Sequence, residues 1–426
     1  MRKSFEFGVR IAAAAFLVAG TFAGAAAQTP RPGTVTPGKG ENYDPVGMPV
    51  GSFRVFPVLE LVELYNSNVY ATSGGTRDDF VTVVRPGLEL RSNWNNHMLN
   101  FFTSGAFGFY AKNSRMDYQD FRVGSEFRVD IQRQWNIYGG AQFNRLHEDP
   151  GSPNATPNAI TDPNKYNQSI ANLGYYQRMN RFSARLDGRV DNYKYTNNRN
   201  QPGGASITNR DRDRTEWTES LRLGYELVEK YEIWVQGGLN QRNYNRNVDS
   251  AGFRRDSTGW EALLGATIDF GGITQVEAFV GYRDQDYSDS RLGHIRGVMF
   301  GMTGFWNPIV PLFVKPFVKR TIEETVSTTQ AGYWATAFGV NVDYAMRPNV
   351  KINGGFSYTI NDYKRINTPG ATSRNDDYIN FEIGLRYLPT ENFYVGPSYQ
   401  FTNRNSNAAG NDFSRHLVAL RGGVQF

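Results

Sequence analysis

The chain of 426 residues contains no cysteine, and this absence excludes disulfides, thiolate metal sites and cysteine nucleophiles. Histidine is scarce as well, and His97, His147, His294 and His416 are scattered without the spacing of metal ligands. No nucleophile elbow or phosphate-binding glycine loop occurs where a strand would lead into a helix. We therefore expect no metal, no cofactor and no enzymatic activity.

Beyond the N-terminal region, the chain has no long hydrophobic run. None there approaches the roughly 20 apolar residues that a transmembrane helix needs. The mean hydropathy is −0.53, a value that resembles that of a soluble protein. A membrane β-barrel also has low mean hydropathy and no long hydrophobic run, because its apolar lipid-facing residues alternate with polar lumen residues. Neither charge sign dominates, with 46 Lys and Arg against 41 Asp and Glu. This balance argues against a dedicated nucleic-acid binder.

The N-terminus has the three-part pattern of a secretory signal peptide: a basic start, a short apolar run and small residues before a cleavage site. A transmembrane anchor is the alternative, but the apolar run is too short to span a bilayer. We predict a signal peptide over residues 1–27, cleaved between Ala27 and Gln28. Residues 28–51 are rich in proline and glycine and predict a flexible periplasmic segment.

The C-terminus alternates between two kinds of residue. Val424 and Phe426 are apolar, whereas Arg421, Gly423 and Gln425 are polar or small. Such a strand, ending on an aromatic residue, suits the closing strand of an outer-membrane barrel. The terminal Phe426 resembles the signal that bacterial barrel-assembly machinery reads, so we expect this residue to direct assembly.

The same two-residue period recurs from residue 52 to the end of the chain and predicts about 18 strands, within a range of 16 to 18. They are expected at 52–64, 78–92, 97–111, 116–131, 135–146, 166–178, 181–195, 214–228, 231–244, 257–270, 273–287, 296–306, 310–322, 332–346, 349–363, 376–388, 392–403 and 413–426. The pattern predicts an all-β, transmembrane, antiparallel up-and-down β-barrel over residues 52–426.

The connections between these strands alternate between short and long, with one exception at 112–115. Outer-membrane barrels have short periplasmic turns and longer external loops, and an even strand number places both termini in the periplasm. The two longest connections, 147–165 and 196–213, are the candidates for folding inward as a constriction.

Strand parity also predicts which charged residues face the lumen. The pore candidates are Arg85, Arg122, Glu126, Arg128, Arg185, Asp187, Arg189, Arg222, Glu277, Arg283, Glu382, Arg386 and Arg421. Charges of both signs hydrate a channel and polarise it. The alternative is that they pair across neighbouring strands and brace the wall, and both interpretations are compatible.

Several segments, taken in order, resemble the putative β-barrel porin 2 family of proteobacterial outer-membrane proteins. These segments are 65–70, 78–80, 85–87, 94–97, 148–153, 209–214 and 281–287. The resemblance covers nearly all of the chain after the signal peptide. It implies an outer-membrane barrel and a link to exopolysaccharide or holdfast-type export loci, and it transfers no catalytic residue.

The leading functional hypothesis is a channel in the outer membrane of a Gram-negative bacterium, with passive or weakly selective passage of small polar solutes. The alternatives are a component of exopolysaccharide or holdfast export, or a structural or adhesive barrel that acts through its loops. The expected partners are outer-membrane lipid and lipopolysaccharide, the barrel-assembly machinery and, for the export alternative, polysaccharide-export proteins. We expect no nucleic acid.

Overall fold

The computed structural model describes residues 43–155, 162–199, 206–271, 273–325, 327, 329–367 and 373–426. The signal peptide predicted from the sequence, with its cleavage site between Ala27 and Gln28, lies outside these residues. No helix within the described ranges is long and apolar enough to cross a membrane.

Eighteen antiparallel strands form the wall of a closed barrel. They are β2 (Phe53–Asn66), β3 (Asp79–Ser92), β4 (Met98–Tyr110), β5 (Tyr118–Gln132), β6 (Trp135–His147), β7 (Lys165–Met179), β8 (Phe182–Tyr195), β11 (Arg214–Val228), β12 (Tyr231–Tyr244), β13 (Ser257–Asp269), β14 (Thr274–Tyr287), β15 (His294–Ile309), β16 (Leu312–Glu324), β17 (Gln330–Arg347), β18 (Val350–Arg365), β19 (Arg374–Tyr387), β20 (Phe393–Ser406) and β21 (Phe413–Gln425). Each wall strand pairs with the next, and β2 pairs with β21 to close the barrel. The predicted fold class is confirmed.

Five smaller elements accompany the wall in the described part of the chain. The 3-10 turns η1 (Ser114–Met116) and η2 (Arg210–Arg212) lie in loops, and β9 (Asn198–Arg199) pairs with β10 (Ser206–Ile207) between β8 and β11. The short strand β1 (Met48–Val50) pairs with the start of β2, which extends beyond its partner β21. β1 therefore covers a strand edge that would otherwise be unpaired.

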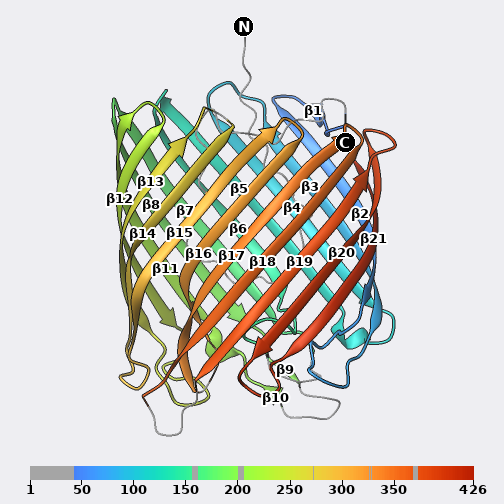
Figure 1. The fold of residues 1–426 in the computed structure, drawn as a ribbon, viewed down its shortest axis with the longest axis vertical. Helices are drawn as coiled ribbons and strands as arrows, with labels where there is room; N and C mark the ends of the chain where they lie inside the picture. The colour runs from blue at the N-terminus through green and yellow to red at the C-terminus, as the bar shows by residue number, and fades with distance from the viewer. Residues whose placement is uncertain are drawn as a thin grey trace.

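Both ends of the described chain lie at the same end of the barrel, at the top of Figure 1, together with the short turns. Two of these turns are closed by residues with positive φ, Asn180 at 54° and Lys230 at 73°. The longer connections lie at the opposite end, where β9 and β10 are also found. This arrangement matches the alternation of connection lengths in the sequence and assigns the long loops to the cell exterior.

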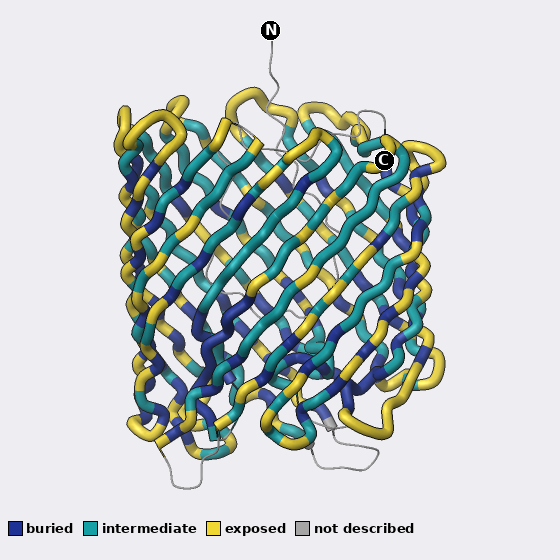
Figure 2. The backbone as a smooth tube through the Cα atoms, in the orientation of Figure 1, coloured by how far each residue is buried: buried dark blue, intermediate teal, exposed yellow. Residues whose placement is uncertain are grey.

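Exposed and less exposed residues alternate along most strands, as Figure 2 shows in yellow against teal and blue. On β7 and β8, the apolar Leu173, Phe182 and Leu186 are 60, 62 and 53% exposed on the outer face. Such side chains suit hydrocarbon, whereas charged ones there would be costly. The polar residues between them therefore face the barrel interior.

One part of the wall departs from this pattern. The ladder between β15 and β16 begins only at Gly301 opposite Lys319 and runs from there toward the periplasmic end. Beyond it, residues 330–337 of β17 are buried on both faces.

Candidate functional site

The inner face of the barrel carries ion pairs between residues two positions apart on one strand. On β8, Arg185 Nε lies 2.7 Å from Asp187 Oδ2, and Arg189 Nε lies 2.6 Å from Asp191 Oδ2. Side chains alternate between the two faces of a strand, so residues two positions apart lie on the same face. Both partners of each pair therefore face the lumen and lie close to each other. β5 repeats the arrangement in the pair formed by Arg128 and Asp130, at 2.9 Å.

Other pore candidates form ion pairs that join different strands. They are Arg85–Glu60 at 2.9 Å, Arg222–Glu277 at 3.2 Å and Arg283–Glu261 at 3.7 Å. Such pairs brace the wall while leaving charges of both signs along the interior.

The remaining pore candidates have other surroundings. The Arg386 guanidinium lies 3.7 Å from the centre of the Tyr394 ring, and Arg421 Nη2 donates to Asn353 Oδ1 at 3.2 Å. Of the other three candidates, Glu126 is exposed, and Arg122 and Glu382 are half-buried. Whether this set determines conduction stays a prediction.

The loop between β6 and β7 reaches across the barrel and contacts strands far from its own in wall order. Asp149 accepts hydrogen bonds from Arg415 Nη1 of β21 at 2.9 and 3.0 Å. The Ser152 carbonyl accepts one from Arg404 Nη1 of β20 at 3.3 Å. Both arginine side chains are almost fully buried, so residues 149–152 of the loop are fixed inside the barrel.

A glycine in this loop explains how the loop can lie so close to β21. Gly151 packs on the Phe413 ring, where an added Cβ would lie 2.7 Å from Cζ. The Asp149 carboxylate also accepts a hydrogen bond from the Gly151 amide at 2.7 Å. The Ser152 amide donates a hydrogen bond to the Asp149 carbonyl at 2.9 Å. The loop thus forms a tight turn that only a residue without a side chain allows at Gly151.

The second long connection, between β8 and β11, supports the first. Arg212 forms an ion pair with Glu148, with one contact of 2.9 Å from Nη1 to Oε2, and its guanidinium lies 3.9 Å from the Tyr195 ring centre. Burial opposes the charge of Arg212, but the nearby Glu148 carboxylate outweighs that effect and raises its pKa. Asn209 Nδ2 adds a hydrogen bond to Asn198 Oδ1 at 2.9 Å.

The end of the β16–β17 hairpin also points inward. Glu324 accepts hydrogen bonds from Tyr287 at 2.9 Å and Tyr244 at 3.1 Å, and it forms an ion pair with Arg242. These partners belong to β12 and β14, which lie four and two strands away from β16 around the wall. The tip is held further by Arg255, which donates to the carbonyls of Thr325 at 3.1 Å and Ser327 at 2.7 Å.

A cavity of about 240 Å³ lies where the two loops and this hairpin end meet. Its lining combines ion-paired and amide side chains with tyrosines, including Glu148, Asn209, Arg212, Arg255, Glu324 and Tyr333. Within the described ranges, no group of three or more His, Asp or Glu residues is arranged to hold a metal ion. The arrangement is a polar constriction in the outer part of the barrel.

Sequence reasoning identified the loops as constriction candidates but missed the residues that fix them. Arg404, Arg415 and Glu324 were not among the predicted site residues, although a signal existed. The acidic run at Glu148 and Asp149 lies in the first loop, and the two arginines lie on the last two strands. Sequence parity gives no means of pairing residues so far apart in the chain.

The predicted assembly signal lies at the periplasmic end of the wall. Phe426 is 44% exposed, and its amide donates to the Pro57 carbonyl at 3.2 Å. The aromatic ring is therefore accessible on the folded barrel, and its role in assembly stays a prediction.

Comparison with known proteins gave one family match. The model of the family described as putative beta-barrel porin 2 matches residues 41–426, nearly the whole described chain. A search of the curated proteins found no match.

Solved barrels share the general shape at low identity. The Pseudomonas aeruginosa channel OccK3 (OpdO) is 14% identical, with 87% of this chain and 96% of that chain covered and a TM-score of 0.43. The values for OccK1 (OpdK) of the same organism are 11%, 88%, 100% and 0.43. The ferric enterobactin receptor PfeA, also from P. aeruginosa, gives 6%, 87%, 80% and 0.45.

Proposed function

The chain belongs to the putative β-barrel porin 2 family, and from that premise we propose that it forms a channel for passive or weakly selective passage of small polar solutes. The protein is a porin-like β-barrel of the Gram-negative outer membrane, embedded in its lipid. We propose further that it catalyses no reaction. Lipopolysaccharide around the outer rim and the barrel-assembly machinery are the partners we propose for it.

One observation carries the channel proposal: the lumen is polar and leaves room for solvent. A barrel of this strand number is wide enough to enclose an aqueous channel. Asn172 and Glu126 lie on the inner face and are nevertheless exposed, so solvent reaches the interior. The inward loops narrow this space without filling it, because the polar cavity remains between them.

Ion selectivity in planar bilayers tests the proposal. Replacing both Arg185 and Arg189 by Gln leaves the partner carboxylates unopposed and should shift selectivity toward cations. The matched variant, Asp187→Asn with Asp191→Asn, should shift it toward anions. Both shifts should nearly vanish in 1 M salt, where the screening length is about 3 Å.

The opposite signs of the two variants separate an electrostatic effect from a general loosening of the wall. A purified, folded barrel that passed no ions would contradict the proposal. The export and adhesive alternatives gain no support from the comparisons, and no feature of the site favours them.

A further inference from the structure

The extracellular half of β17 does not behave as a barrel wall. Residues 330–337 are all buried, whereas a wall strand should expose every second residue to lipid. Figure 2 shows this stretch as part of a dark patch low on the near wall. Farther along the same strand the normal pattern returns, since Phe338 is 39% exposed. Something therefore covers the outer face of β17 near its start.

The covering element is the neighbouring part of the wall itself. The β15–β16 ladder includes Gly301 opposite Lys319, but among the described residues none of 294–300 pairs with β16. β16 continues to pair with β17 as far as Glu324 opposite Gly332. The wall therefore splits between β15 and β16, and the sheet that begins with β16 curls into the lumen.

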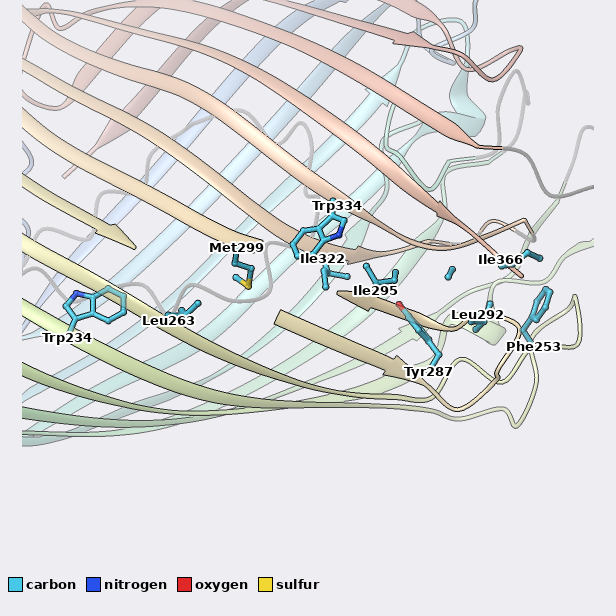
Figure 3. Packing of buried hydrophobic residues seen from close by; sticks show 11 residues of the cluster. Trp234, Phe253, Leu263, Tyr287, Leu292, Ile295, Met299, Ile322, Trp334 and Ile366 are labelled. Carbon is cyan, nitrogen blue, oxygen red and sulfur yellow. The ribbon is translucent and has the colours of Figure 1, made fainter. Parts of the chain in front are cut away.

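Side-chain contacts show the overlap directly. A Cβ placed on Gly332 would lie 2.7 Å from Ile295 Cδ1, and one on Gly297 would lie 3.3 Å from the Trp334 ring. Ile322 and Trp334, which occupy outward positions of β16 and β17, join the same buried cluster as Ile295 and Met299 of β15. Figure 3 shows these side chains meeting between the strands. The outer face of the curled sheet thus packs on the inner face of β14 and β15.

This overlapping seam is held differently from the rest of the wall. Elsewhere backbone ladders join neighbouring strands, whereas here apolar packing and the Glu324 contacts at the tip do so. Backbone groups at membrane depth favour internal partners, so the edges of β15 and β16 favour pairing with each other. Moving Ile322 and Trp334 outward to lipid would cost little, because lipid tails are as apolar as the packed cluster.

Arg320, Thr336 and, at the extracellular end of β16, Glu324 are polar residues that share that outward face and limit the movement. Arg320 lies 4.7 Å from the Trp334 ring centre and donates to Thr336 Oγ1 at 3.0 Å. An outward arginine costs about 2–4 kcal/mol at the midplane but only about 0–1 near the interface. Since Arg320 lies in the extracellular half of β16, the uncurled wall remains accessible to the protein.

We propose that this seam is the gate of the channel: the extracellular end of β16 and β17 closes the pore while it is curled inward, and opens the pore when it uncurls and pairs with β15. The proposal rests on the proposed channel function. Opening would withdraw the Glu324 tip from the lumen and complete the wall ladder. Glu324, held by Tyr287, Tyr244 and Arg242, is the latch of the closed state.

Engineered thiols test the movement, and the absence of native cysteine makes any pair unambiguous. Continuing the register of the existing ladder places Val298 opposite Ile322 in the uncurled wall. Oxidation of a V298C/I322C variant, with a short bifunctional thiol reagent in parallel, should trap that state as a gel-mobility shift. The control is M302C/V318C, a pair already opposed in the structure, which should cross-link at once.

Conductance gives the second readout. Cross-linking V298C/I322C should raise single-channel conductance by roughly twofold or more, because the tip leaves the lumen, and reduction should reverse the change. Failure of this pair to cross-link while the control pair does would overturn the gate, and so would cross-linking without a change in conductance. A barrel that stayed silent in every state would instead contradict the channel proposal itself.

Weakening the contacts of Glu324 gives an independent test of the gate. Tyr287→Phe removes only the hydroxyl that donates to Glu324 Oε1 at 2.9 Å and keeps the packed ring. On the V298C/I322C background it should speed cross-linking several-fold, with no effect on the M302C/V318C control. An unchanged rate would show that Glu324 does not hold the closed state.

Discussion

Leu173 and Asn172 are adjacent residues at the middle of β7, and their side chains face opposite sides of the wall. Leu173 is 60% exposed on the outer face, and Asn172 is exposed on the inner one. Leu173→Arg should therefore destabilise the assembled barrel by about 2–4 kcal/mol, because the charge enters hydrocarbon. Asn172→Arg, at the same depth, should leave stability nearly unchanged. Urea unfolding in lipid vesicles measures both, and equal effects would mean that the register is shifted by one residue.

Asp289, in the loop between β14 and β15, provides a pH-dependent test. Hydrogen bonds from the Arg291 side chain, at 2.8 and 2.6 Å, lower the pKa of Asp289, and the Arg254 amide adds another at 3.1 Å. Because the folded pKa is lowered, the contribution of Asp289 is complete above the ordinary aspartate pKa of about 3.9. It is lost as the pH falls further, toward the folded value.

Amide hydrogen exchange in this loop should follow that dependence. Wild-type protection should be constant above about pH 5 and decline below about pH 4. Asp289→Asn should give weaker protection with little pH dependence, whereas Asp286→Asn, at a more exposed carboxylate nearby, should resemble wild type. A pH profile of Asp289→Asn that matched wild type would contradict this account.

At the scale of single residues, the sequence predicted which face a side chain takes but not what it touches. Arg185 and Asp187 form a predictable pair, because residues two apart share one face of a strand. Arg415 and Asp149 do not, because their contact depends on how a long loop crosses a closed barrel. Local periodicity contains no information about that crossing.

The loop between β6 and β7 is the element whose removal should change function most. Replacing residues 149–154 by a short glycine and serine linker should raise single-channel conductance by roughly twofold or more, because the lumen widens. The matched replacement of residues 246–248, which are exposed at the outer rim, should leave conductance unchanged. Conductance that stayed constant after the first replacement would show that this loop does not limit flow.

Strand spans were predictable to within a few residues, because the two-residue period continues through each strand. The predicted strands 214–228 and 231–244 coincide with β11 and β12, whereas β15 and β19 begin two residues earlier than predicted. The curl of β16 and β17 was not predictable. Ile322 and Trp334 are apolar at outward positions, and that pattern fits lipid contact as well as burial under a neighbouring strand.

At the scale of the whole molecule, the strand number and the alternation of connections fix the orientation in the membrane. Eighteen strands return the chain to the side where it started, and Figure 1 places both ends of the described chain with the short turns. In the outer membrane those turns face the periplasm and the long loops face the medium. The connection lengths therefore set the orientation, and the even strand number places both ends of the described chain on the periplasmic side.

Epitope tags test this orientation in intact cells. A tag inserted after Asn247, in an exposed stretch of the loop between β12 and β13, should bind antibody without permeabilisation. A tag after Asn95, in the turn between β3 and β4, should bind only after the outer membrane is opened. Position 153 is a poor choice although it lies in a long external loop, because that loop folds into the lumen and Pro153 lines the cavity. Labelling at Asn95 but not at Asn247 in intact cells would reverse the orientation, and the constriction and the seam would then face the periplasm.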